Sequence, residues 1–187
     1  MTDLVSTARA LAEAKLADTL PRRWKHVQAV AEKAEQLSDA LDETARQVLI
    51  AAAWLHDIGY APDLVETGFH PLDGARWLRE QGFDDRVVCL VAHHSCAHVE
   101  AEERGLADDL KSEFVREQSP VADELWYCDM TTGPDGQNFD VESRLVEIHS
   151  RYGPEHIVTR FIQRARPEIV TTVRRVEDRL RQAGHPM

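Results

Sequence analysis

The feature that most constrains this chain is a set of histidines and aspartates on the apolar faces of successive predicted helices. The pair His56-Asp57 follows the apolar run AAAWL, and His26 and Asp129 lie on the inward faces of two other predicted helices. Imidazoles and carboxylates without partners are costly to bury in an apolar core. A bound cation removes that cost, so the pattern predicts a metal centre inside a helical bundle.

Helical periodicity extends over almost the whole sequence and predicts an all-α fold. Asp42 is a favourable N-cap, Pro21 is tolerated in a first turn, and Gly59 is a favourable helix end. No alternation of apolar and polar residues persists over five positions, so no strand is expected. The expected helices are 3–19, one from 21 through 37, 43–58, 70–82, 84–95, one from 120 through Asp129, and two within 139–182 that are separated by Gly153-Pro154, with a kink at Pro167.

Two stretches depart from this helical periodicity. Residues 98–118 are acidic and only weakly periodic, and we expect them to be solvated and partly irregular. The segment TTGPDGQ (131–137) is the strongest turn signal in the chain. Seven arginines between Arg160 and Arg181 form either a charged helix face or a contact for a partner or substrate.

Composition narrows the functional classes. A length of 187 residues favours a single domain over 1–187, and a net charge of −11 argues against binding to a nucleic-acid duplex. No apolar run approaches the ~20 residues of a membrane span, so no membrane partner is expected. The N-terminus lacks signal-peptide features, and three cysteines without CxxC spacing fit reduced thiols, so we expect a cytoplasmic protein.

The pattern H…HD…D, formed by His26, His56-Asp57 and Asp129, resembles the HD-domain superfamily of metal-dependent phosphohydrolases. The resemblance extends to the segments RRWKHVQAV, HDIGY, HPLDGARWL and VAHHS, and covers about residues 20–135. It implies an HD-domain-like helical bundle in which the C-terminal helices 139–182 belong to the same domain. Among the family's branches, the chain looks most similar to small nucleotide hydrolases that hold two metals.

The resemblance also implies a ligand set. His26, His56, Asp57 and Asp129 would bind one divalent metal ion, and His70 and His94 would bind a second, with Asp57 as the bridge. Neutral imidazole and carboxylate ligands suit Fe, Mn, Ni, Mg or Zn. Without a metal role, His70 would be a helix cap beside Pro71 and His94 a packed core residue.

Two adjacent cations can activate a water and neutralise phosphoryl oxygens, so the expected partner is a small phosphorylated substrate of the nucleotide class. Asp57, Arg23 and His93 are the candidate catalytic residues, with His93 beside the ligands or facing the substrate. Many relatives carry Lys three residues after the Asp, where this chain has Tyr60. Arg23 can partly replace that lysine, because a guanidinium binds phosphate bidentately.

Two other functional classes stay open at this stage. One is an oxygenase, because some proteins similar to this family use a mixed-valent di-iron pair on the same ligand set. The other is a non-catalytic regulatory module that the metal stabilises, although the complete ligand set argues against it. The sequence also leaves a homo-oligomer open.

Overall fold

The computed structural model describes residues 3–184, and within this range the regular structure is helical, which confirms the all-α prediction. Thr132 and Asn138 form one isolated β-bridge. The helices are α1 (Leu4–Leu16), α2 (Pro21–Leu37), α3 (Glu43–Leu55), α4 (His70–Glu80), α5 (Asp85–Ala92), α6 (Ala97–Arg104), α7 (Ala107–Glu113), α8 (Pro120–Met130), α9 (Val141–Tyr152) and α10 (Ile157–Gln182), with the short 3₁₀ helices η1 (Ser38–Ala40), η2 (Ile58–Tyr60) and η3 (His94–Cys96).

Polar side chains fix where the main helices begin. The Asp42 carboxylate accepts the backbone N–H of Ala45 at 3.0 Å, which confirms the predicted cap of α3. Ser119 caps α8 and Asp140 caps α9 in the same way. Helix α3 ends at Leu55, before the expected residue 58, because the chain tightens there into the 3₁₀ turn η2.

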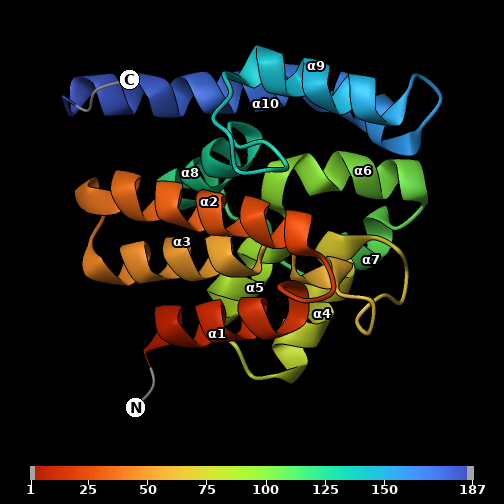
Figure 1. The fold of residues 1–187 in the computed structure, drawn as a ribbon, viewed down its shortest axis with the longest axis horizontal. Coiled ribbons are helices and arrows are strands. Elements are labelled where there is room, and N and C mark those ends of the chain that lie inside the picture. The colour runs from red at the N-terminus through yellow and green to blue at the C-terminus, as the bar shows by residue number, and fades with distance from the viewer. Residues whose placement is uncertain (1–2, 185–187) are drawn as a thin grey trace.

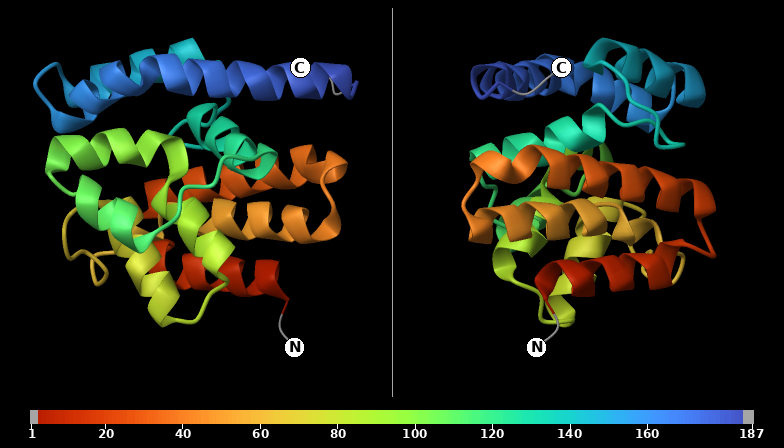
Figure 2. Two further views of the ribbon diagram at one scale, coloured as in Figure 1. Left: turned by 180° about the vertical axis from the view of Figure 1, so that it is seen from behind. Right: turned by 60° about the vertical axis from the view of Figure 1, so that its left-hand side comes forward.

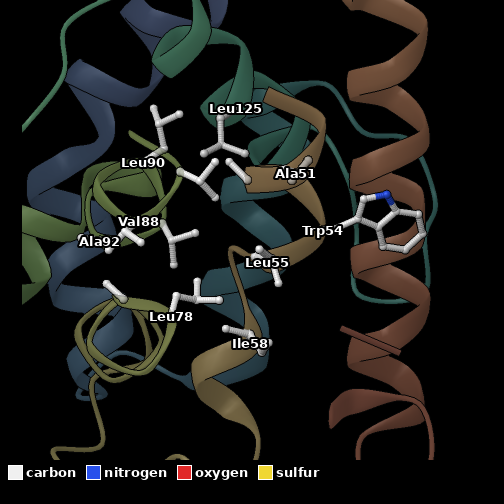
Figure 3. Close-up of a cluster of buried hydrophobic side chains, with 14 of the residues drawn as sticks. Ala51, Trp54, Leu55, Ile58, Leu78, Val88, Leu90, Ala92 and Leu125 are labelled. Atoms are coloured by element: carbon white, nitrogen blue, oxygen red, sulfur yellow. The ribbon is translucent and has the colours of Figure 1, made fainter. Parts of the chain in front are cut away.

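Helix α3 lies at the centre of the bundle and packs against α1, α2, α5 and α8 (Figure 1). It is buried nearly all round, as its apolar run predicts. Ala51 and Leu55 of α3 meet Leu78 of α4 and Leu125 of α8 in one apolar cluster (Figure 3). Because α3 is held on several sides, its C-terminal end has a fixed position in the interior.

Helices α9 and α10 form a separate layer across the bundle, seen along the top of Figure 1 and in both views of Figure 2. A second apolar cluster joins this layer to α8 through residues that include Trp126, Leu145 and Ile169. Helix α10 continues through Pro167 to Gln182. The layer therefore covers the side of the bundle to which Asp129 of α8 belongs.

The expectation for residues 98–118 is confirmed in part, because most of the stretch is exposed or half-buried and residues 114–118 are irregular. The stretch also contains α6 and α7, which the sequence did not predict, and Glu100, Ala101 and Leu110 are buried. The helices are short, and each buries too few residues to produce a clear periodic pattern. No helix in the described part of the chain is both long enough and apolar enough to cross a bilayer.

The backbones of η2 and α4 approach each other closely at Gly59. A Cβ atom placed on Gly59 would lie 2.0 Å from the carbonyl oxygen of His70 and 2.7 Å from the nitrogen of Gly74. Gly59 therefore serves as more than a helix end, because it lets the start of α4 lie directly against the chain that follows Asp57.

We expect Gly59→Ala to lower the free energy of unfolding by at least about 2 kcal/mol, because the new methyl group meets rigid backbone. Gly74→Ala is the comparison variant and should destabilise the protein less. Its Cβ would lie 3.0 Å from the nitrogen of Gly59, and the higher helix propensity of alanine offsets part of that cost. Urea unfolding of both variants measures the difference. Equal stability of Gly59→Ala and wild type would contradict the close packing.

Candidate metal centre

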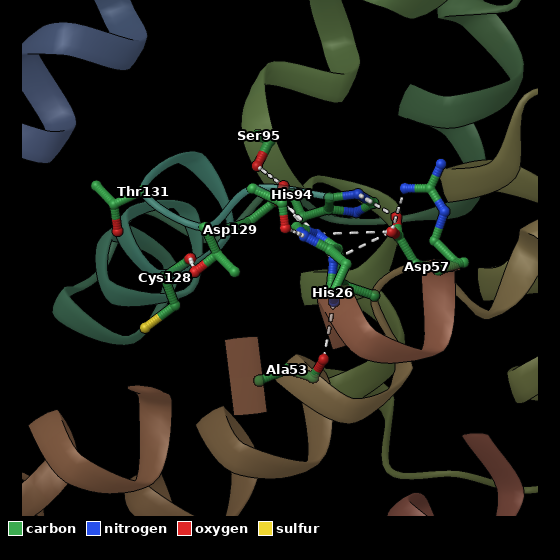
Figure 4. A network of polar contacts seen from close by, with 12 residues as sticks. His26, Ala53, Asp57, His94, Ser95, Cys128, Asp129 and Thr131 are labelled. Atoms are coloured by element: carbon green, nitrogen blue, oxygen red, sulfur yellow. Dashed lines mark hydrogen bonds and ion pairs between the residues drawn. The ribbon is translucent and has the colours of Figure 1, made fainter. Parts of the chain in front are cut away.

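Six side chains from separate elements meet at one point inside the bundle (Figure 4). Their ligand atoms form two groups, and within each group the atoms all lie within 4.8 Å of one another. The first group is His26 of α2, His56 at the end of α3 and Asp129 of α8; the second is Asp57, His70 at the start of α4, and His94 after α5. The structure therefore brings together every residue that was predicted as a metal ligand.

Backbone carbonyls fix the orientation of three of the imidazoles. His26 Nδ1 donates to Gly133 at 3.0 Å, His56 Nδ1 donates to Ala53 at 2.8 Å, and His94 Nδ1 donates to Val91 at 2.6 Å. A carbonyl oxygen can only accept, so the ring proton of each neutral imidazole lies on Nδ1. Each Nε2 atom then presents a lone pair to the centre of the cluster.

Those lone pairs face other acceptors. His26 Nε2 lies 3.0 Å from Asp129 Oδ1, and His56 Nε2 lies 3.5 Å from Asp57 Oδ2. His56 is completely buried, and its Nε2 atom has no hydrogen-bond partner among the described residues. An arrangement of lone pairs against carboxylates is unfavourable unless a cation lies between them.

Asp57 faces both groups with different oxygens. Its Oδ2 atom lies 3.5 Å from His56 Nε2 and 3.8 Å from His26 Nε2. Its Oδ1 atom lies 3.3 Å from His70 Nε2 and 3.9 Å from His94 Nε2. A carboxylate that shares its two oxygens between two ligand groups has the geometry of a bridge between two ions.

The spacing of the donors fits metal coordination. Bonds of about 2.1 Å at angles of about 90–109° place neighbouring ligand atoms about 3.0–3.4 Å apart. The contacts across the first group, from 3.0 Å for His26–Asp129 to 3.8 Å for His56–Asp129, lie at or just above that range. The nitrogen and oxygen donors suit Fe, Mn, Ni, Zn or Mg, which makes the cluster compatible with binding of divalent metal.

The ionisation states also suit metal binding. Burial lowers the pKa of His70 to about 4, and burial also lowers the pKa of His94. Burial opposes ionisation of Asp57, yet the Arg23 guanidinium holds the pKa of that carboxyl well below its usual value. Neutral imidazoles and ionised carboxylates are the forms that bind metal.

Arg23 lies directly beside the ligands. Its guanidinium contacts Asp57 Oδ2 at 2.7 Å and lies 4.0 Å from the centre of the Tyr60 ring, which also stacks on His70. Burial raises the pKa of the Tyr60 hydroxyl, so this residue supplies no charge. Tyr60 instead holds both Arg23 and His70, and Arg23 supplies the positive charge.

His93 is the one predicted site residue that the structure does not bring to the cluster. Its Nε2 atom lies 2.9 Å from the carbonyl oxygen of Phe114, and its own carbonyl accepts the indole N–H of Trp126. Helix α5 ends at Ala92, so His93 and His94 diverge where the helix geometry stops. His93 therefore links the end of α5 to the segment before α8.

Sequence reasoning missed Ser95, whose Oγ donates to Asp129 Oδ2 at 2.5 Å. Ser95 and Cys96 both have positive φ angles, 47° and 60°, an uncommon conformation for residues other than glycine. This turn directs His94 toward Asp57 and His70. It also places the Ser95 hydroxyl against the Oδ2 atom of Asp129. No local motif marks such a turn, so it could not be predicted from the sequence.

A cavity of about 80 Å³ lies against the ligands, and α9 and α10 form its far wall. Arg23 and Tyr60 line it on the bundle side, while Arg144, Arg151 and Tyr152 line it from α9. The arginines of α10 that the sequence singled out pair instead with acidic residues, as Arg164 does with Glu102 and Glu103. The arginines that face the metal site are therefore those of α9, which sequence reasoning did not select.

A third set of potential ligands, Cys96, His98 and Glu168, also lies within 4.8 Å. Here a cation is already present, because Arg116 pairs with Glu168 and approaches His98 Nε2 to 3.4 Å. Burial raises the pKa of the Cys96 thiol, which opposes the thiolate form that metals need. This set reads as a structural ion-pair network.

Comparison with known proteins agrees with the geometry. The family model described as HD domain matches residues 23–165, well over half of the chain. The match begins at Arg23, contains all six ligand candidates and reaches beyond residue 135 through α9 into α10. No curated protein and no solved structure matches the chain significantly.

We expect Ser95→Ala to weaken metal affinity roughly 10–100-fold, the usual cost of removing a hydrogen bond to a ligand. Ser95→Gly lacks the same hydroxyl but relaxes the positive φ angle, so equal losses in both variants would identify the hydrogen bond as the cause. Ser112→Ala, which removes an exposed hydroxyl, is the control. Metal titration with a chelator competitor measures the affinities, and unchanged affinity in Ser95→Ala would contradict this role.

We expect two histidine variants to separate the two ligand groups. His56→Ala should lose the ion of the first group and lower the thermal midpoint, while His94→Ala should lower the metal stoichiometry by about one ion and leave the first group loaded. His149→Ala is the control, because His149 is exposed. Elemental analysis of folded protein gives the result. Wild-type metal content in His56→Ala would refute the first group, and a single ion in metal-replete wild type would refute the second.

Proposed function

The chain belongs to the HD-domain family, and we propose that it is a metal-dependent phosphohydrolase acting on a small phosphate ester or anhydride of the nucleotide class. The observation that carries the proposal is the convergence of two ligand groups on Asp57, with the Arg23 guanidinium 2.7 Å from the same carboxylate. A cationic side chain beside a dinuclear ligand set suits a phosphoryl group.

The six ligand residues would hold one or two divalent ions, of Fe, Mn, Ni, Mg or Zn. Such ions, when bound, would activate water and neutralise phosphoryl oxygens. Asp57 orients the two ligand groups toward each other through its two oxygens. Asp129 contributes one oxygen, because Ser95 holds the other.

The reaction that fits this site is hydrolysis by water. The water oxygen forms a bond to phosphorus, and the bridging P–O bond breaks with its electron pair on the leaving oxygen. One water proton passes to the leaving oxygen, and the other stays with the released phosphate or is lost to solvent. Arg23 orients the phosphoryl group and offsets its charge, a role that lysine has in many relatives.

The wall formed by α9 and α10 supports a substrate with an organic part. Ile148, Tyr152, Val158 and Phe161 line the same cavity as the ligands. Apolar and aromatic side chains of this kind suit the non-phosphate portion of a nucleotide. A cytoplasmic location is part of the proposal, and three free cysteines, two of them buried, support it.

We expect Arg23→Ala to lower kcat on the best phosphorylated substrate by about 100-fold or more, because a charged contact to the phosphoryl group is lost. Metal content should stay normal, since Arg23 is not a ligand. Arg23→Lys should recover part of the rate, because it keeps the charge but loses the planar guanidinium. Arg174→Ala on the exposed face of α10 is the control.

A panel of nucleotides and other phosphate esters, assayed with Mn, Fe, Ni, Zn and Mg, tests the function itself. Wild-type turnover in Arg23→Ala would leave this residue only the task of neutralising Asp57. Failure to hydrolyse any substrate, with all phosphorylated products analysed, would refute the hydrolase, and oxygen uptake by the iron-loaded protein would then favour the di-iron oxygenase alternative.

A further inference from the structure

A second cavity, of about 330 Å³, adjoins the metal cavity and is lined almost entirely by basic and neutral side chains. Its lining contains four arginines and no aspartate or glutamate among the described residues. The shared lining of the two cavities consists of Arg23, His26, Arg144 and Arg151. A protein with a net charge of −11 thus has a purely cationic cavity beside its ligand cluster.

The two arginines of α9 are short of negative partners. Arg144 and Arg151 share one carboxylate, that of Glu147, which lies 3.2 Å from Arg151 Nε and also contacts Arg144. Arg22 and Arg23 differ, because each has an aspartate of its own, Asp135 and Asp57. Asp129 of the ligand cluster also attracts Arg144, but it lies beyond ion-pair distance, so Glu147 is the single carboxylate that contacts the pair on α9 among the described residues.

Arg144 is buried to an unusual degree for a charged residue. It is 6% exposed, and its Nε–H has no hydrogen-bond partner in the described part of the chain. A buried donor without an acceptor on a charged group is costly. Arg151 lies seven residues along α9, two helical turns away, so both side chains can face the same cavity.

We propose that Arg144 and Arg151 bind a phosphate group other than the one that reacts, so the preferred substrate class is an organic polyphosphate with two or more phosphate groups. The inference rests on the proposed hydrolase function and specifies its substrate. The reacting phosphoryl group lies at the smaller cavity, with Arg23 and the ligand residues. The larger cavity then has both the room and the charge for a further phosphate.

Binding of inorganic tripolyphosphate to the metal-loaded protein tests the site directly. Isothermal titration should show binding to wild type that exceeds binding of orthophosphate. The affinity should fall roughly 10-fold or more in Arg151→Gln and in Arg144→Gln. Arg166→Gln, at an exposed α10 arginine that pairs with Glu142, is the matched control and should bind as wild type does.

Glu147→Gln provides a test in the opposite direction. Removing the carboxylate that Arg144 and Arg151 share should free both guanidiniums and tighten tripolyphosphate binding. Weaker or unchanged binding in this variant would overturn the assignment. Because Arg144 is buried, Arg151→Gln and Glu147→Gln keep the test decisive if Arg144→Gln fails to fold.

Turnover gives the second readout. With a nucleoside triphosphate and the matching monophosphate, wild type should prefer the triphosphate in kcat/KM, and Arg151→Gln should lower kcat/KM for the triphosphate by a larger factor than for the monophosphate. An equal loss on both substrates would place Arg151 at the reacting group and overturn the proposal. If nothing is hydrolysed, the proposed function fails, while the tripolyphosphate titration still decides whether the anion site exists.

Discussion

Burial of unshared electron pairs is the constraint on which the rest of this structure depends. His26, His56 and His94 direct their Nδ1 protons to backbone carbonyls, so their Nε2 atoms meet the oxygens of Asp57 and Asp129 with nothing to donate. Protonating all three rings would bury several positive charges, which is no less costly. A divalent cation would resolve this conflict, so we expect metal binding and folding stability to be coupled in this chain.

Backbone features that are far apart in the sequence position these ligand side chains around one centre. The turn after α8 presents the Gly133 carbonyl to His26, and the absence of a side chain at Gly59 lets His70 lie against the segment after Asp57. The strained turn at Ser95 and Cys96 brings His94 inward and holds Asp129. Strain of this kind persists only where the surrounding packing fixes it, and α6, α8 and α10 supply that packing here.

The ligand residues could be predicted because each lies on an apolar helical stripe or at a helix end. At such positions the helical periodicity shows that the side chain points into the bundle. His93 could not be separated from His94 in this way, since their divergence depends on where α5 stops. Ser95 and Arg144 act through contacts across elements, such as the 34-residue separation between Ser95 and Asp129, which leave no local pattern. The burial of Glu100 was missed for a related reason, because α6 is too short to show a stripe.

Charge in this protein is organised by pairing, and its distribution explains why an acidic chain can still offer a site for anions. The arginines of α10 are matched by acids on neighbouring elements, as Arg175 and Arg179 are by Asp123. Paired surface charges contribute little field beyond the Debye length of about 8 Å in physiological salt. The two guanidiniums of α9, which share the carboxylate of Glu147, lie instead within a cavity, where low-dielectric walls concentrate their field. Local geometry rather than the net charge of −11 therefore decides which ligands the cavity accepts.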